Sequence, residues 1–284
     1  MGRTKLSAMP PNPLKRLLIA QVRKTFNDAA KGETPVIRQP DGLFGPQSVC
    51  WRVHGDVVTM MVGGVAALLL QMLHPAVLAG VWDHSAFRQD MLGRLRRTAR
   101  FIAVTGYDSR AAAEAAIAKV REVHTRVKGT LPDGTPYAAD DPHLLAWVHV
   151  TEAVCFLDAW IRYAEPRMST ADQERYFAEF AIIAEALGAD PIPRSRAEAE
   201  ALILSMRGEL VADARTREVA RLVLAQPAPS LAMKPFQAMV FGAAVDLLPD
   251  WARAMHGLSG AGVATPVIRT GTAGMASAFR WAFR

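Results

Sequence analysis

Apolar positions recur along most of the chain at the three- and four-residue spacing of helices, and strand-like alternation is nearly absent. Helix boundaries carry cap signals, because Asp141 precedes a helix-starting proline, Ser169 or Thr170 can cap the next helix and Gly188 follows its predicted end. The sequence therefore predicts an all-α fold. The expected helices cover residues 57–73, 85–105, 109–128, 142–164, 170–187, 194–225 and 232–247.

The pattern predicts one multi-helix domain with extensions at both ends. Residues 1–45 form a proline-containing N-terminal arm, 46–260 the helical domain and 261–284 a basic C-terminal tail. A chain of 284 residues with 51% hydrophobic content can bury one large core, and no shift in composition divides it. Residues 131–137, with a proline and an Asp-Gly pair, predict a turn or short hairpin between two helices.

One apolar run is long enough to raise the question of a membrane span. Residues 57–82 contain no Asp, Glu, Lys or Arg, which meets the length criterion for a spanning helix. Two glycines, Gln71, His74 and Pro75 interrupt the run. We therefore interpret it as a buried core helix that ends or kinks before Pro75, with a membrane span as the alternative.

Charge and cysteine content narrow the class of protein. The net charge is +6, but the basic residues are scattered and no nucleic-acid-binding module is present, so we expect no nucleic-acid partner. The two cysteines, Cys50 and Cys155, imply neither a disulfide framework nor a thiolate metal site. The apolar run near the N-terminus is too short for a signal peptide, so a cytoplasmic location is expected, with possible membrane association.

The chain lacks the motifs of hydrolases, nucleotide-binding proteins, zinc peptidases and covalent haem proteins, which leaves histidines in apolar surroundings as the candidates. His124 shares a helix face with Ile117, Val120 and Val127, so its imidazole is expected to point inward. A desolvated imidazole is neutral and can bind a metal or haem iron, although a structural core histidine is the commoner case.

Two further groups could border a site. His149 lies within an apolar helix with Glu152 one turn onward, where the two could pair with each other or support a site. Arg94, Arg97 and Thr98 share a helical stripe with an aromatic ring, which could bind carboxylates or form a solvated basic face.

Taken together, several short segments resemble the family that groups a fungal oxygenase of mycophenolic acid synthesis with the rubber oxygenases called latex clearing proteins. The resemblance covers residues 53 to 258 and looks like the bacterial branch of that family. It is carried by Leu73-His74-Pro75, Asp83-His84-Ser85, Arg94-Leu95-Arg96-Arg97-Thr98 and residues 123–129 and 140–152.

The resemblance implies a globin-like helical fold around non-covalent haem b, with His124 as the proximal iron ligand. It also implies that Arg94 and Thr98 line the haem pocket. The rubber oxygenases have a lysine where this chain has Arg97, and an arginine cannot ligate iron as a deprotonated lysine does. By position, Asp83 is the nearest counterpart of their catalytic base.

The resulting hypothesis is a haem-dependent oxygenase that uses dioxygen and an unidentified redox partner on an apolar isoprenoid or lipid-like substrate. In this hypothesis Arg94 and Arg97 pair with the haem propionates, while Thr98, His74 and His149 shape the oxygen side or support the site. Two alternatives stay open, a haem or lipid carrier or sensor without turnover, and a peripheral membrane helical protein without a cofactor that is anchored by its basic, aromatic tail.

Overall fold

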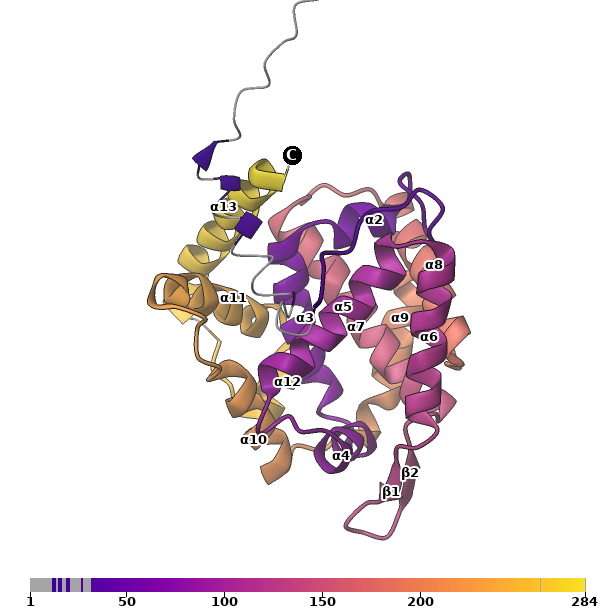
Figure 1. Ribbon diagram of the computed structural model, residues 1–284. Coiled ribbons are helices and arrows are strands. Elements are labelled where there is room, and N and C mark those ends of the chain that lie inside the picture. The colour runs from indigo at the N-terminus through magenta and orange to yellow at the C-terminus, as the bar shows by residue number, and fades with distance from the viewer. Residues whose placement is uncertain are drawn as a thin grey trace, which may run out of the picture.

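The computed structural model describes residues 12, 13, 15, 16, 19, 20, 27, 32–260 and 262–283. Most of the first 31 residues of the predicted arm therefore lie outside the described part of the chain. Within that part the fold is all-α, as predicted, with a single two-stranded hairpin (Figure 1). The α-helices are α2 (Val49–His54), α3 (Val57–Gln71), α4 (Pro75–His84), α5 (Met91–Tyr107), α6 (Arg110–His124), α7 (Pro142–Tyr163), α8 (Thr170–Leu187), α9 (Arg196–Met206), α10 (Ala214–Leu224), α11 (Lys234–Leu247), α12 (Asp250–His256) and α13 (Thr265–Phe283).

The predicted caps form where the sequence places them. The Asp141 carboxylate accepts a hydrogen bond from the His143 N–H at the start of α7, and the Ser169 hydroxyl does the same for Asp172 in α8. Gly188 ends α8 in the left-handed conformation that glycine adopts without strain. The predicted hairpin is also present, as strands β1 (Lys128–Thr130) and β2 (Pro136–Ala138).

Two long predicted helices are broken in the structure. The apolar run ends as α3 at Gln71 and restarts as α4 at Pro75, which bends the chain by 104°. Proline fits the first turn of a new helix, and the His74 side chain caps that turn by accepting from the Ala76 N–H. The predicted helix over 194–225 divides into α9, a short 3-10 turn at Arg207–Glu209 and α10, because Asp213 forms a capping box that starts a new helix.

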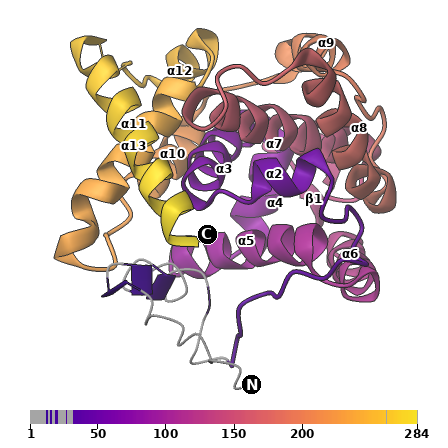
Figure 2. The same cartoon turned by 90° about the horizontal axis from the view of Figure 1, so that it is seen from above.

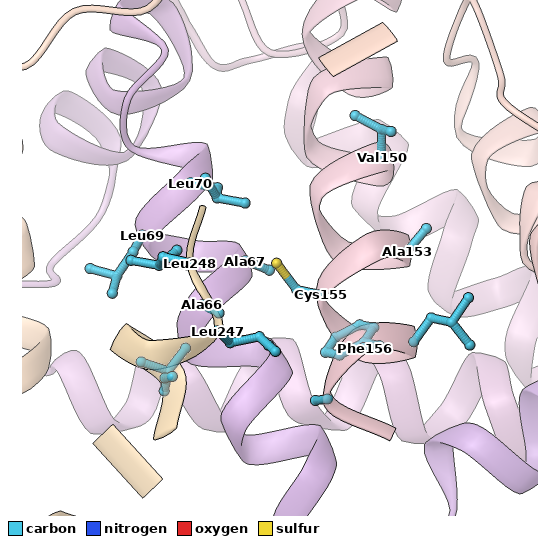
Figure 3. Packing of buried hydrophobic residues seen from close by; sticks show 14 of the residues in the cluster. Ala66, Ala67, Leu69, Leu70, Val150, Ala153, Cys155, Phe156, Leu247 and Leu248 are labelled. Atoms are coloured by element: carbon cyan, nitrogen blue, oxygen red, sulfur yellow. The ribbon is translucent and has the colours of Figure 1, made fainter. Parts of the chain in front are cut away.

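The core is centred on α3 and α7, which pack side by side (Figure 3). Small side chains at the contact allow a close approach, with Ala67 of α3 against Cys155 of α7. Gly63 of α3 lies directly against the backbone of α7, since a Cβ at this position would be 2.8 Å from the Cys155 carbonyl oxygen. Helices α11 and α13 cover α3, while α8 and α9 cover α7 (Figure 2).

The C-terminal residues form an ordered helix that two ion pairs hold to the core. Arg280 of α13 pairs with Asp56, a buried aspartate that also caps α3, and the two side chains are 2.5 Å apart. Arg269 of the same helix pairs with the buried Asp246 of α11 at 2.8 Å. The tail predicted from residue 261 onward therefore becomes a packed helix from Thr265.

Among the described residues one helix, α7, has the length and apolar composition needed to cross a membrane. The pairs α3–α4 and α11–α12 would bring that number to three if each bent pair counted as one span. In α7 72% of the most apolar window is buried inside the protein, so its apolar character serves the core described above.

Candidate functional site

His124 is the last residue of α6, a helix that begins with Ser109 as its cap and packs against α5 and α8. Of the predicted inward face, Ile117 is buried and His124 is half-buried, whereas Val127 lies beyond the end of α6. Among the described residues neither imidazole nitrogen of His124 has a hydrogen-bond partner. Burial lowers the pKa of His124, opposed in part by the charge of Asp140, so the neutral imidazole offers a free lone pair.

The hairpin that follows His124 is fixed to the end of α4. The Tyr137 hydroxyl donates to the Asp83 carboxylate at 2.7 Å, and His84 Nε2 lies 3.1 Å from the carbonyl oxygen of Lys128. Burial and the neighbouring Asp83 carboxylate raise the pKa of Tyr137 to about 12. The glycine at 129 packs directly on the Tyr137 ring, where a Cβ would come within 2.6 Å of the hydroxyl oxygen. Asp83 is exposed, and its hydrogen bond from Tyr137 holds the hairpin that follows α6.

The predicted basic stripe of α5 divides into one half-buried and two exposed side chains. Arg94 is half-buried, and burial together with the charge of Arg97 lowers its pKa. Among the described residues no carboxylate pairs with Arg94. Arg97 and Thr98 are exposed, and Arg97 has an anionic neighbour in Asp90, with 3.7 Å between the charged atoms. Within the described ranges, Arg97 of this stripe therefore has a carboxylate neighbour and Arg94 has none.

The middle of α5 carries apolar side chains that the chain itself buries only partly. Leu95, Phe101 and Ile102 contact the edge of the core, yet no residue from 92 to 104 is fully buried. α5 packs mainly on α6 and α2, and it runs along one side of the α3–α7 layer (Figures 1 and 2). An apolar stripe of α3 that includes Met61 and Leu68 is also half-buried. Such surfaces suit burial by an apolar ligand.

His149 and Glu152 of α7 do not pair, so the first of the two interpretations of their spacing is wrong. His149 is buried with its ring 4.9 Å from that of Phe180, its Nε2 has no hydrogen-bond partner, and burial lowers its pKa to about 4. Glu152 is half-buried and interacts with Gln71 of α3, and burial raises its pKa to about 7. The two residues therefore occupy separate environments on the same helix.

The structure places His74 in a cluster that the sequence did not predict. His74 Nε2 lies 3.3 Å from Glu209 Oε2, and His143 Nε2 lies 2.9 Å from the same oxygen. Burial lowers the pKa of His74, although Glu209 opposes this effect. The three residues are 69 and 66 positions apart in the chain, so no local pattern could reveal them. The one signal in the sequence was Pro75, which predicts a helix break beside His74.

These features describe a helical domain in which, among the described residues, half-buried His124 has no hydrogen-bond partner and half-buried Arg94 has no carboxylate partner. The chain belongs to the family described as ER-bound oxygenase mpaB/B'/rubber oxygenase, catalytic domain, because a sequence model of that family matches residues 51–281. No curated protein and no solved structure shows significant similarity to the chain. The resemblance inferred from the short segments is thus confirmed at the level of the family.

Proposed function

We propose that the protein is a haem b-dependent oxygenase acting on an apolar isoprenoid or lipid-like substrate, with His124 as the iron ligand. The observation that carries the proposal is the neutral, half-buried His124, which has no hydrogen-bond partner in the described part of the chain, in a chain that belongs to an oxygenase family. An unpaired imidazole nitrogen at a helix end would be a suitable ligand for haem iron. The Tyr137–Asp83 hydrogen bond would keep the chain that follows His124 in position.

The residues present fit a haem group in two further respects. Arg94 is desolvated and has no carboxylate partner among the described residues, which suits a propionate carboxylate, since an arginine pairs with a carboxylate in bidentate geometry. The half-buried apolar side chains of α5 suit the flat apolar faces of the macrocycle and exclude water from it. Bound haem would supply the activation of dioxygen, and the protein would supply the ligand, the counter-charge and the dry surroundings.

The other predicted site residues take smaller parts in this proposal. Arg97 and Thr98 are exposed, so they contribute at most to the rim of the site. Asp83 is engaged by Tyr137 and is assigned to positioning rather than to proton transfer. His149 is buried against Phe180 and His74 is held by Glu209, so neither is assigned to the iron.

The test of haem binding is reconstitution of the purified full chain with haemin, followed by absorption spectra of the wild type and of His124→Ala. His143→Ala is the matched control, since the exposed His143 side chain lies on α7 and pairs with Glu209. We expect a Soret band in the wild type and in the control, and its loss or a large shift in His124→Ala that stays folded by circular dichroism. An unchanged Soret band in His124→Ala overturns the assignment.

A second pair of variants tests the propionate contact. Arg94→Ala removes a desolvated charge partner and is expected to weaken haem affinity by about 10- to 100-fold, whereas the exposed Arg97→Ala changes it by less than about threefold. Equal losses in the two variants contradict the assigned role of Arg94. Product analysis of isoprenoid alkenes incubated with haem-loaded protein, dioxygen and a reductant then separates an oxygenase from a haem carrier, which would release no carbonyl product.

A further inference from the structure

We infer that His74, His143 and Glu209 form a binding site for a divalent transition-metal ion such as Zn²⁺, separate from His124. Each residue offers one ligand atom, and the three atoms all lie within 4.8 Å of one another. Two imidazoles and one carboxylate are a donor set that suits Zn²⁺ or Fe²⁺ and does not suit Mg²⁺ or Ca²⁺. This inference does not depend on haem binding.

The geometry is close to what such an ion needs. The His143 Nε2–Glu209 Oε2 distance is 2.9 Å and the His74 Nε2–Glu209 Oε2 distance is 3.3 Å. Ligands about 2.0–2.1 Å from a tetrahedral zinc lie about 3.3 Å apart, so small side-chain rotations would complete three corners. His74 is buried, while the side chains of His143 and Glu209 are exposed, which leaves the fourth corner open to water.

The backbone around the three ligands is held in place independently of them. Val211 N–H donates to the Leu73 carbonyl oxygen at 2.8 Å, which ties the segment carrying Glu209 to the residue before His74. His143 is the second residue of α7, and its N–H is fixed by the Asp141 cap. The cluster therefore joins three segments that are distant in the sequence at rigid element ends, which is favourable for a preorganised site.

The charge balance also favours a cation. Within the described part of the chain Glu209 has only the two histidines as ion-pair partners, and neither an arginine nor a lysine neutralises it. The nearby Arg207 guanidinium instead stacks on Trp251, 4.7 Å from the ring centre. The Asp141 carboxylate acts on His74 electrostatically and adds a second negative charge to the surroundings.

Metal binding requires one rearrangement of a proton. His74 Nδ1 accepts a hydrogen bond from the Ala76 N–H at 3.3 Å, so in the metal-free chain the proton of a neutral His74 is on Nε2. Coordination through Nε2 moves that proton to Nδ1 and breaks this long contact. A long neutral hydrogen bond is worth little beside the coordination of an ion by three ligands.

The experiment uses the full chain stripped with a chelator and titrated with Zn²⁺ by calorimetry and by competition with a chromophoric chelator, before and after haemin is added. We expect one Zn²⁺ per chain and a Soret band that does not change on zinc addition. His143→Ala and Glu209→Gln should each weaken zinc binding by at least about tenfold. Glu200→Gln, an exposed glutamate on the adjacent α9, is the matched control and should bind as the wild type does.

A stability measurement supplies an independent readout. Zn²⁺ at a hundredfold excess over its dissociation constant should raise the Tm of the wild type by about 5 °C, and of Glu209→Gln by much less. Wild-type protein that binds no stoichiometric Zn²⁺, or Glu209→Gln protein that binds and is stabilised like the wild type, overturns the inference. Neither result bears on His124, whose test is the haem spectrum.

Discussion

The adjacent glycines of α3 offer a sharp test of the packing between α3 and α7. An alanine Cβ at position 63 would lie 2.8 Å from the Cys155 carbonyl oxygen and 2.9 Å from Cα of Phe156, both backbone atoms of α7. At position 64 the nearest atom is Cε1 of the Phe156 ring, at 3.7 Å, an ordinary contact. The two substitutions therefore make the same chemical change in one helix and differ in available space.

The magnitudes follow from two opposing effects. Replacing a helical glycine by alanine stabilises a helix by up to about 1 kcal/mol. At Gly63 the new methyl group forces the two helices apart, and overpacking of this kind costs about 1–3 kcal/mol, with the upper end expected where backbone must move. Gly63→Ala should therefore lower the free energy of unfolding by about 2 kcal/mol, whereas Gly64→Ala should leave it unchanged or raise it slightly.

The assay is urea unfolding of haem-free protein followed by far-ultraviolet circular dichroism. The midpoint should fall for Gly63→Ala and stay or rise for Gly64→Ala, with similar slopes, since neither change alters the surface exposed on unfolding. In thermal unfolding the Gly63→Ala variant should melt about 5 °C lower than the wild type. Equal stability of the two variants would show that α3 and α7 are not as close as described.

Two further predictions concern the carboxylates of Glu152, which is half-buried, and Asp246, which is buried. Burial raises the pKa of Glu152 to about 7 from an ordinary 4.5, so its contribution to stability is fully present below about pH 4.5 and is lost as the pH rises to about 7. Glu152→Gln should therefore become more stable than the wild type by up to about 3 kcal/mol above pH 7. Urea unfolding at pH 5 and pH 8 measures this, and a stability difference that is the same at both pH values contradicts it. Asp246→Asn removes the shared partner of Arg162 and Arg269, so it should cost about 1–3 kcal/mol and speed tryptic release of α13. Asp250→Asn, a change in a fully exposed carboxylate that pairs with Arg253, should do neither.

Local signals in the sequence account for the parts of the fold that were predicted. Caps such as Asp141, Ser169 and Gly188 act through neighbouring residues, so their spacing alone places a helix end. Pro75 correctly indicated a break, but the same residue is a good first residue for a new helix, and apolar spacing continues on both sides. The change of direction between α3 and α4 depends on the cap that His74 forms, and that cap cannot be read from the spacing of apolar residues.

The candidate site was predictable where it depends on one helix and not where helices meet. The spacing within α6 places His124 on the same side as the buried Ile117, and its side chain is half-buried. The partners of Glu152 and His74 come from other elements, Gln71 of α3 in one case and Glu209 after α9 in the other. The exposure of Arg97 and Thr98 likewise depends on how α5 packs, so a stripe of suitable residues could not separate them from Arg94.

Helix α4 links the two proposed sites, and this link determines how they must be tested. Its first turn is capped by His74 of the proposed metal site, while Asp83 near its other end holds the hairpin that follows His124. A helix of ten residues is about 15 Å long and transmits a shift of one end to the other when both ends are held. Zinc bound at His74 would break its cap to Ala76, so a shift carried along α4 to the hairpin is expected to change haem affinity, while the iron ligand and the position of the Soret band stay the same. Haem affinity therefore has to be measured in zinc-free protein first, because only then does a change in the spectrum of His124→Ala report on the ligand itself.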